Sequence, residues 1–381
     1  MSKQLITFIR DYFGSNEFIP LHAPVFSGKE QEYVADTITS TFVSSVGAYV
    51  DRFESDMATY TGAGKAVATV NGTAALHIAL KLAGVTIGDL VVTQPLTFVA
   101  TCNAIAYCNA EPVFIDVDRE TLGLSAKALE FWLVENAALD AEGVCRTKTD
   151  HKVIRACVPM HTFGHPVDLD GLLAVTQRWN ITLVEDAAES LGSFYKGKHT
   201  GTFGTLGTLS FNGNKIMTTG GGGMILAANE ELGKHAKHLT TTAKKPHSYE
   251  YIHDEVGYNY RLPNLNAALG CAQLEQLEAF IAAKRLLAIS YEQALLGTNL
   301  SFVKESENCR SNYWLNAVIC ENKSHRDELL DVTNKQGVMT RPIWALMNNL
   351  DMYKSSRSGD LTNAEWLEAR VVNLPSSVLV K

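Results

Sequence analysis

The feature that most constrains the fold is an alternation of short β-rich runs with helical patterns between residue 66 and about residue 228. Strand-like runs such as AVATV, LVVTQP and PVFIDVD are separated by helical patterns such as TAALHIALKLAG and TFVATCNAIAYC. The strand-like runs KVIRACVPMH, ITLVEDAAES, GTLSFN and GGMILAA continue the series. This pattern predicts an α/β fold, in which a mainly parallel sheet has helices on both faces. Ligands of such sheets bind outside the carboxyl ends of the strands, so we expect the functional residues there.

The pattern changes near residue 245, which predicts a domain boundary. The stretch TTTAKKPHSYEYIHDE is polar and has neither a helical nor a strand period. It is followed by a long helical stretch, LPNLNAALGCAQLEQLEAFIAAKRLLA, and then by a mixture of short strands and helices. We therefore predict a large domain over residues 1–245, with the N-terminal helical segment included, and a smaller C-terminal α+β domain over residues 246–381.

Charge, hydropathy and cysteine spacing argue against several classes of protein. The formal net charge is −8, which does not suit a protein that binds nucleic acid phosphates. No apolar run approaches the roughly 20 residues of a membrane helix, and the start MSKQLITFIRDYFGSNEF does not resemble a signal peptide. The seven cysteines lack zinc-binding or disulfide spacing. We expect a cytoplasmic protein with reduced cysteines, no metal, no nucleic acid partner and no membrane association.

A single lysine, Lys215, stands in the stretch SFNGNKIMTTGGGG, before four consecutive glycines. In a Walker A loop the lysine directly follows a glycine and precedes serine or threonine. Here Asn214 precedes the lysine and Ile216 follows it, so the nucleotide-hydrolase signature is absent. The glycines Gly220–Gly223 are typical of a tight turn that needs positive φ. The role of Lys215 therefore depends on what surrounds it.

Three other patterns concern groups that could bind a ligand. Gly72 and Thr73 open a helix after a strand, where free N–H groups form an anion site, although a simple helix cap has the same pattern. Ser210 ends another strand and offers a hydroxyl group. Glu185 and Asp186 end the strand ITLVED and should point to opposite faces of the sheet. A metal is an alternative partner for such a carboxylate, but no histidine or second carboxylate cluster accompanies it.

Taken together, these patterns suggest a ligand with a phosphate, a basic ring nitrogen and a carbonyl carbon. Pyridoxal 5′-phosphate has all three. On this interpretation Lys215 forms a Schiff base with the cofactor aldehyde, and an acidic side chain keeps the pyridine nitrogen protonated so that the ring withdraws electrons.

The sequence also resembles the sugar aminotransferases of the DegT/DnrJ/EryC1/StrS family, within the fold-type I group of pyridoxal phosphate enzymes. The resemblance covers nearly the whole chain and runs in family order through FVSSVGAYVDRFES, NGTAALHIAL, TFVATCNAI, PVFIDVD, EDAAES, SFNGNK, GGGGM, GYNYRLPNLNAALGCAQL and NLPSS. It implies a fold-type I aminotransferase. Relatives that carry out dehydration have histidine in place of the lysine, so Lys215 favours transamination.

Matched motif by motif, the resemblance implies that Lys215 is the catalytic lysine and that Asp186 pairs with the pyridine nitrogen. It implies that Gly72, Thr73 and Ser210 hold the phosphate.

Three further residues are matched in the same way. Phe98 matches the aromatic residue that stacks on the cofactor ring, although a core phenylalanine is the plain alternative. Glu189 matches a position near the ring hydroxyl. Asn259 matches an asparagine that reaches the phosphate bound by the neighbouring subunit, which implies a homodimer with shared active sites.

The resemblance also implies the substrates: L-glutamate as amino donor, giving 2-oxoglutarate, and a nucleotide-linked keto-deoxysugar as acceptor, for surface glycan biosynthesis. Two segments of the chain are most similar to one branch of the family: PLHAPVFSGKEQEYVADTITSTFVSSVGAYVDRFE and RPIWALMN. Members of this branch act at C4 of UDP-2-acetamido-2,6-dideoxy-4-ketohexoses, in bacillosamine or legionaminic acid pathways. The alternatives are GDP- or dTDP-linked 4-keto or 3-keto sugars, a sugar dehydratase and a non-catalytic cofactor-binding sensor. One departure affects recognition: many relatives have a histidine after the arginine that matches Arg341, whereas this chain has Met347.

Other polar residues suit more than one role. His161 and His165, in MHTFGHPVDLD, follow a strand and could contact substrate or form local hydrogen bonds. The basic cluster KHAKHLTTTAKK could attract a diphosphate, but we favour a solvated helix face.

Overall fold

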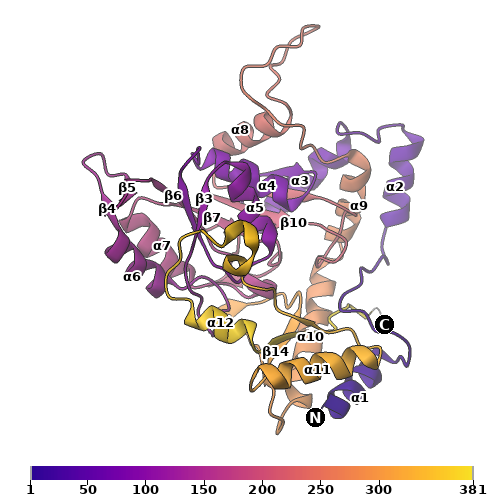
Figure 1. Ribbon diagram of the computed structural model, residues 1–381. Helices are drawn as coiled ribbons and strands as arrows, with labels where there is room; N and C mark the ends of the chain where they lie inside the picture. The colour runs from indigo at the N-terminus through magenta and orange to yellow at the C-terminus, as the bar shows by residue number, and fades with distance from the viewer. Residues whose placement is uncertain (1, 380–381) are drawn as a thin grey trace.

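A seven-stranded sheet forms the centre of the computed structural model, which describes residues 2–379 (Figure 1). The strand order is β1-β11-β10-β7-β6-β2-β3. β11 runs antiparallel to β1 and β10, and the other neighbouring strands are parallel. The predicted α/β fold is confirmed, and each strand-like run named above overlaps a strand of this sheet. The strands are β1 (Lys65–Thr69), β2 (Leu90–Thr93), β3 (Glu111–Phe114), β6 (Ile154–Val158), β7 (Thr182–Asp186), β10 (Leu206–Ser210) and β11 (Gly223–Ala227).

Helices cover both faces of this sheet. Successive strand residues point to opposite faces: in β1, Val67 packs with α4, α5 and α8, while Ala66 packs with α3. In β2, Val91 packs with α4 and α5, while Val92 packs with α6 and α7. Burial on both faces explains why the strands are continuous apolar runs. The helices are α3 (Ala48–Thr61), α4 (Gly72–Leu82), α5 (Val99–Tyr107), α6 (Ala126–Asn136), α7 (Leu169–Arg178) and α8 (Glu230–Thr240).

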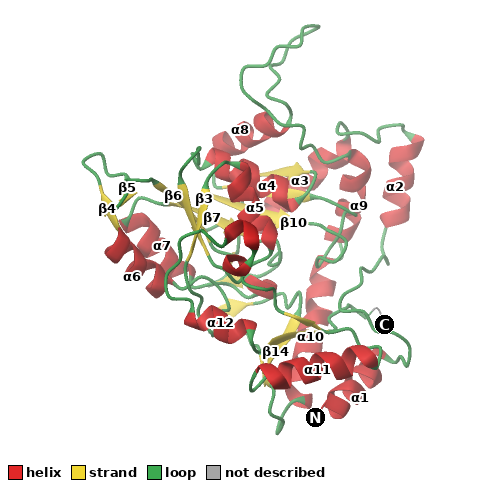
Figure 2. Cartoon of the chain, in the orientation of Figure 1, coloured by secondary structure: helices red, strands yellow, loops and turns green. Residues whose placement is uncertain are grey.

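A second, four-stranded antiparallel sheet has the order β12-β14-β16-β15. Its core includes Val318 and Val372 from the strands, Ile9 from α1, Tyr291 from α10 and Leu329 from α11. α1 begins the chain but packs with this C-terminal part (Figures 1 and 2). The division into residues 1–245 and 246–381 stays a prediction. The elements are α1 (Ser2–Phe13), α10 (Leu277–Ala294), β12 (Ser301–Phe302), β14 (Asn316–Ile319), α11 (Lys323–Lys335), β15 (Arg341–Pro342) and β16 (Val371–Leu374).

The helical stretch expected after residue 262 consists of two helices, α9 (Asn264–Leu274) and then α10. α9 packs against α2 (Glu30–Thr39) and α3, on the side of the large sheet. Asn264 ties α9 to α3, because its Oδ1 accepts hydrogen bonds from the N–H groups of Tyr49 and Val50 at 3.1 and 3.2 Å. The first of the two helices therefore lies with the N-terminal half of the chain.

The remaining elements are short, and a long loop leaves the body of the molecule. Residues 243–256 form a loop, called the 243–256 loop, that extends beyond α8 at the top of Figure 1. Tyr249 and Tyr251 of this loop are exposed. Within residues 2–379 no helix combines the length and apolarity of a membrane span. The seven cysteines are all free. The short elements are β4 (Ala137–Leu139), β5 (Cys145–Thr147), β8 (Phe194–Tyr195), β9 (Lys198–His199), β13 (Cys309–Arg310), α12 (Thr362–Glu368) and the 3-10 turns Thr162–Gly164, Met347–Asn349 and Asp351–Tyr353.

Candidate active site

A cavity of about 290 Å³ lies where β7 and β10 end and α4 begins. This is the carboxyl edge of the sheet, where ligands of α/β proteins bind. The cavity brings together residues from segments that are far apart in the sequence. Seven of the eight residues selected from the sequence line it: Gly72, Thr73, Phe98, Asp186, Glu189, Ser210 and Lys215.

Asp186 is the last residue of β7, and its buried carboxylate faces the cavity. Thr101 Oγ1 donates a hydrogen bond to Oδ2 at 2.7 Å, and the N–H of Ala188 donates to Oδ1 at 3.2 Å. Burial raises the pKa of Asp186, because the charged form is poorly solvated there, and the hydrogen bond from Thr101 opposes that rise. A cationic group in the cavity would offset the cost of the buried charge.

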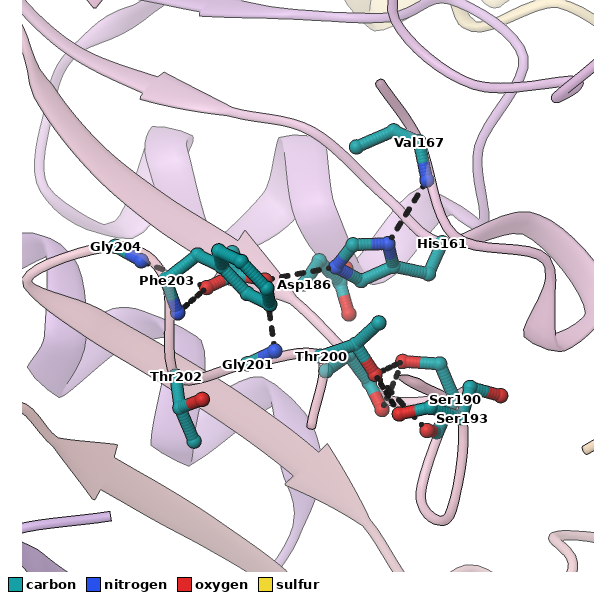
Figure 3. Close-up of polar contacts among 12 residues, drawn as sticks. His161, Val167, Asp186, Ser190, Ser193, Thr200, Gly201, Thr202, Phe203 and Gly204 are labelled. Carbon is teal, nitrogen blue, oxygen red and sulfur yellow. Dashed lines mark hydrogen bonds and ion pairs between the residues drawn. The ribbon is translucent and has the colours of Figure 1, made fainter. Parts of the chain in front are cut away.

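Glu185, the preceding residue, points to the opposite side of β7, as the alternation of a strand requires. His161 Nε2 lies 3.0 Å from its Oε2, and the N–H groups of Gly201, Phe203 and Gly204 donate at 2.6 to 2.7 Å. Figure 3 shows these donors around the strand. Glu185 does not line the cavity, and it fixes the loop that precedes β10.

The hydrogen bonds of His161 define its tautomer. Its Nδ1 accepts a hydrogen bond from the N–H of Val167, so Nε2 carries the proton and donates to Glu185 (Figure 3). Burial alone would raise the pKa of Glu185, but His161 and the backbone donors outweigh it and hold this pKa below its usual value. His161 therefore has the structural role that the sequence analysis left open.

Lys215 and Glu189 meet inside the cavity. Lys215 Nζ lies 3.2 Å from Glu189 Oε1, and the N–H of Phe163 donates to Glu189 Oε2 at 2.9 Å. Burial raises the pKa of Glu189 to about 7, and the charge of Lys215 opposes the rise. The side chain of Lys215 is 12% exposed, so its amine is within reach of a ligand in the cavity.

The start of α4 fits a phosphate group. Asn71 caps the helix by accepting the N–H of Ala74 at 2.8 Å. The first N–H groups of a helix lack intrahelical partners, so those of Gly72 and Thr73 are available to an anion. A Cβ at Gly72 would lie 2.9 Å from Ser210 Cβ, so only glycine lets the helix start come this close to the Ser210 hydroxyl.

A family comparison identifies the chemistry that this cavity supports. A model of the DegT/DnrJ/EryC1/StrS aminotransferase family matches residues 25–381. The chain belongs to this family. It is an aminotransferase that uses pyridoxal 5′-phosphate, and the cavity fits this cofactor with a phosphate cradle, a buried carboxylate and a lysine amine.

Individual relatives of this aminotransferase match over nearly all of their length. The GDP-perosamine synthase of Escherichia coli O157:H7 is 36% identical over 360 residues, which cover 94% of this chain and 93% of that protein. The GDP-perosamine synthase of Caulobacter vibrioides is 36% identical over 362 residues, with coverages of 94% and 93%. The crystal structure of the aminotransferase TlmJ from Streptoalloteichus hindustanus has a TM-score of 0.84 and 28% identity, with coverages of 94% and 93%.

Some selected residues lie outside the cavity of the aminotransferase. Asn259 is exposed, bonds to Arg261 Nε at 3.0 Å and is not among the lining residues, so its predicted role across a dimer stays a prediction. His165 is buried against the ring of Tyr313. Met347 is also buried, and its N–H donates to the carbonyl of Pro95 at 2.9 Å.

The basic cluster on α8 pairs with acidic residues of the 243–256 loop. His235 Nε2 lies 3.1 Å from Glu255, and His238 Nε2 lies 2.7 Å from Asp254. In residues 2–379 the one group of side chains close enough to hold a metal is His238, Asp254 and Glu255, and none of them lines the cavity. The expected absence of a metal stays a prediction.

Several lining residues were missed by the sequence analysis. Asn212 and Asn214 lie on either side of Gly213, just before Lys215, and asparagines at these positions are not a distinctive sequence signal. Trp314 and Trp344 come from the C-terminal part, just before β14 and just after β15. No spacing relates them to Lys215, because the chain returns to the cavity only through tertiary packing.

Proposed function

We propose that this aminotransferase transfers the amino group of L-glutamate to C4 of a keto-deoxysugar linked to GDP. The observation that carries the nucleotide assignment is that two relatives with 36% identity over 94% of this chain are GDP-perosamine synthases. The UDP-linked acetamido sugar expected from the sequence has no counterpart among these relatives' names. It is the alternative outcome of the experiment below.

Gly72, Thr73 and Ser210 would hold the cofactor phosphate, since two helix N–H groups and a hydroxyl converge at the start of α4. Asp186 would pair with the pyridine nitrogen, which restores a charge partner to a buried carboxylate. Phe98, half exposed at the cavity, would lie against the flat ring. When bound, the cofactor supplies a carbonyl carbon for the amine and a ring that withdraws electrons.

Lys215 and Glu189 would carry out the proton movements. Lys215 would hold the cofactor covalently through Nζ and would be released when glutamate takes its place. The freed Lys215 Nζ would take the proton from Cα of glutamate and pass it to the cofactor, and in the second half-reaction it would take the proton back and give it to C4 of the sugar. Glu189, 3.2 Å from Nζ, keeps the freed amine in reach of both carbon atoms.

The proposal includes a homodimer with shared sites. Asn259 is exposed and lies next to the 243–256 loop, which extends away from the body of the subunit. In a dimer, Asn259 of the partner subunit would complete the phosphate site. This part of the proposal is tested separately by the mixing experiment in the Discussion.

The test is incubation of the protein with pyridoxal phosphate, glutamate and a panel of GDP-, UDP- and dTDP-linked 4-keto-6-deoxysugars, followed by mass spectrometry of the sugar products. An amine formed only, or by far fastest, from the GDP-linked sugar supports the proposal. Preference for the UDP-linked acetamido sugar would restore the expectation from the sequence. A product that has lost a hydroxyl without gaining nitrogen would indicate a dehydratase.

A further inference from the structure

The indole ring of Trp314 is a second partner of Lys215 that the proposed chemistry does not yet use. Lys215 Nζ lies over this ring, 4.1 Å from its centroid, while Glu189 Oε1 approaches the same nitrogen at 3.2 Å. Trp314 lines the cavity but is only 4% exposed. An aromatic face attracts an ammonium group through its quadrupole. The amine is therefore held between a carboxyl group and an aromatic face.

Hydrogen bonds hold Trp314 both at its indole ring and at its backbone. Its indole Nε1 donates a hydrogen bond to the carbonyl of Asn214, the residue before Lys215, at 2.7 Å. Its own carbonyl accepts a hydrogen bond from the fully buried Lys284 Nζ at 3.0 Å. These contacts tie the ring to the backbone that carries Lys215, so the ring and the lysine keep a constant relation.

Asn312 couples Trp314 to Glu189. Its Oδ1 accepts the N–H of Trp314 at 2.8 Å, and its Nδ2 donates to the carbonyls of Glu189 and Leu191, each at 2.9 Å. Gly164 makes room for this side chain, since a Cβ there would lie 1.8 Å from Asn312 Oδ1. One buried amide thus sets the spacing between the two groups that contact Lys215.

The two partners of Lys215 differ in one chemical property. The carboxylate of Glu189 can accept the proton of the ammonium group. The indole face stabilises the ammonium group but has no lone pair in that direction, so it leaves the proton on nitrogen. Lys215 must carry a proton from one carbon atom to another. It therefore benefits from a partner such as the indole face, which holds the ammonium group without removing its proton.

We propose that Trp314 is a positioning residue for Lys215: its indole face holds the released amine, with its proton, at the place from which the proton is transferred. This inference rests on the proposed role of Lys215 in proton transfer. Loss of the aromatic face should slow that step about tenfold, the size of a partly buried cation–π contact. Binding of glutamate should not change, because Trp314 contacts the lysine rather than the donor.

The first measurement is NMR of the full chain labelled with ¹³C at the lysine ε carbons, without cofactor. The Lys215 signal is identified by its loss in Lys215→Arg. In the wild type it should be shifted upfield by the ring current of Trp314, and Trp314→Leu should remove the shift. Trp314→Phe, which keeps an aromatic face but loses the bond to Asn214, should keep part of it. A wild-type Lys215 signal without an upfield shift would overturn the inference.

The second measurement is the single-turnover reaction with glutamate, with and without deuterium at Cα. Trp314→Leu should slow it about tenfold and increase the isotope effect at unchanged glutamate affinity, and Trp314→Phe should recover most of the rate. Trp179→Leu is the matched control, because Trp179 donates its Nε1 to Glu130 at 3.2 Å outside the cavity. Equal losses in the Phe and Leu variants would assign the effect to the hydrogen bond and contradict the role of the ring.

The two measurements separate the inference from the proposed function. The ring-current shift needs neither cofactor nor substrate, so it decides the contact between Trp314 and Lys215 even if the sugar assignment is wrong. A wild-type protein with the shift but without any reaction with an amino donor would refute the proposed function. A reactive Trp314→Leu protein with wild-type rate and isotope effect would refute the positioning role alone.

Discussion

Glu185 and Asp186 are consecutive residues of β7, yet the carboxylate of Asp186 lines the cavity while that of Glu185 is enclosed on the opposite side by His161 and the N–H groups of residues 201, 203 and 204. Two adjacent strand residues cannot rotate independently. The hydrogen bonds of Glu185 therefore fix the direction in which Asp186 enters the cavity. Sequence position alone would not tell which of the two carboxylates faces the ligand.

Replacing Lys215 with alanine should abolish amino transfer and leave the fold intact. The amine is the group that binds the cofactor and moves the proton, so turnover should fall by roughly 10³-fold or more. Turnover and the near-ultraviolet circular dichroism spectrum are measured together. Lys198→Ala, at an exposed position, is the control. A Lys215→Ala protein that still transaminates would contradict the assignment.

Replacing Glu185 with glutamine should destabilise the protein by about 2–3 kcal/mol at pH 7, because a charged acceptor of several hydrogen bonds becomes a neutral amide. The pKa of Glu185 is held below its usual value, so its contribution is complete above the unfolded-state value of about 4.3 and is lost as the pH falls through the folded-state value. The difference in the free energy of unfolding between the two proteins, measured with urea, should therefore become smaller as the pH falls from 7 to 3. Glu130→Gln, which removes a more exposed ion pair with Arg178, should change stability by less than about 1 kcal/mol.

Glu189 should have the opposite effect on stability in the absence of cofactor. Its pKa is raised to about 7, so the folded protein retains a proton that the unfolded chain releases. Relative to Glu189→Gln, the wild type should lose about 3 kcal/mol of stability as the pH rises from about 4.5 to 7, and little more above that range. Urea unfolding across this range measures the difference. A difference that does not change with pH would show that folding leaves the pKa of Glu189 unchanged, and would contradict the prediction.

Mixing two inactive variants tests the shared active site. Asn259→Asp places a carboxylate beside the partner's phosphate, and Lys215→Ala removes the lysine, so each homodimer should be inactive. After unfolding and refolding together, hybrid dimers contain one intact site, and roughly a quarter of wild-type activity should return at equal amounts. A fully active Asn259→Asp protein, or no recovery in the mixture, would contradict the shared site.

The sequence was sufficient for the sheet and for the part of the cavity at the strand ends and at the start of α4, because these depend on local patterns. A strand buried on both faces must be apolar along its length, and a residue at its carboxyl end, such as Asp186 or Ser210, is placed at the site edge by the topology. Gly72 and Thr73 are placed at the same edge because they open α4, the helix that follows β1. The motif resemblance added the chemical role of Lys215 and the cofactor.

The sequence could not indicate where α1 packs or which C-terminal residues reach the cavity. The apolar face of α1 is compatible with either sheet, and the packing of Ile9 with Tyr291 and Leu329 decides it. Likewise Met347 was noted as a departure from the family, but it is buried and does not line the cavity, whereas Trp344 of the same segment does.

The sequence by itself determined the α/β sheet and its carboxyl-edge site, because periodicity and strand ends are local properties of the chain, and the motif resemblance selected Lys215 and Asp186 within that site. Only the tertiary structure decided what surrounds the lysine. Trp314 reaches Lys215 through the hydrogen bonds of Asn312 to residues 189 and 191 and of Lys284 to the Trp314 carbonyl. Contacts of this kind depend on the close packing of segments distant in sequence, which no local pattern encodes.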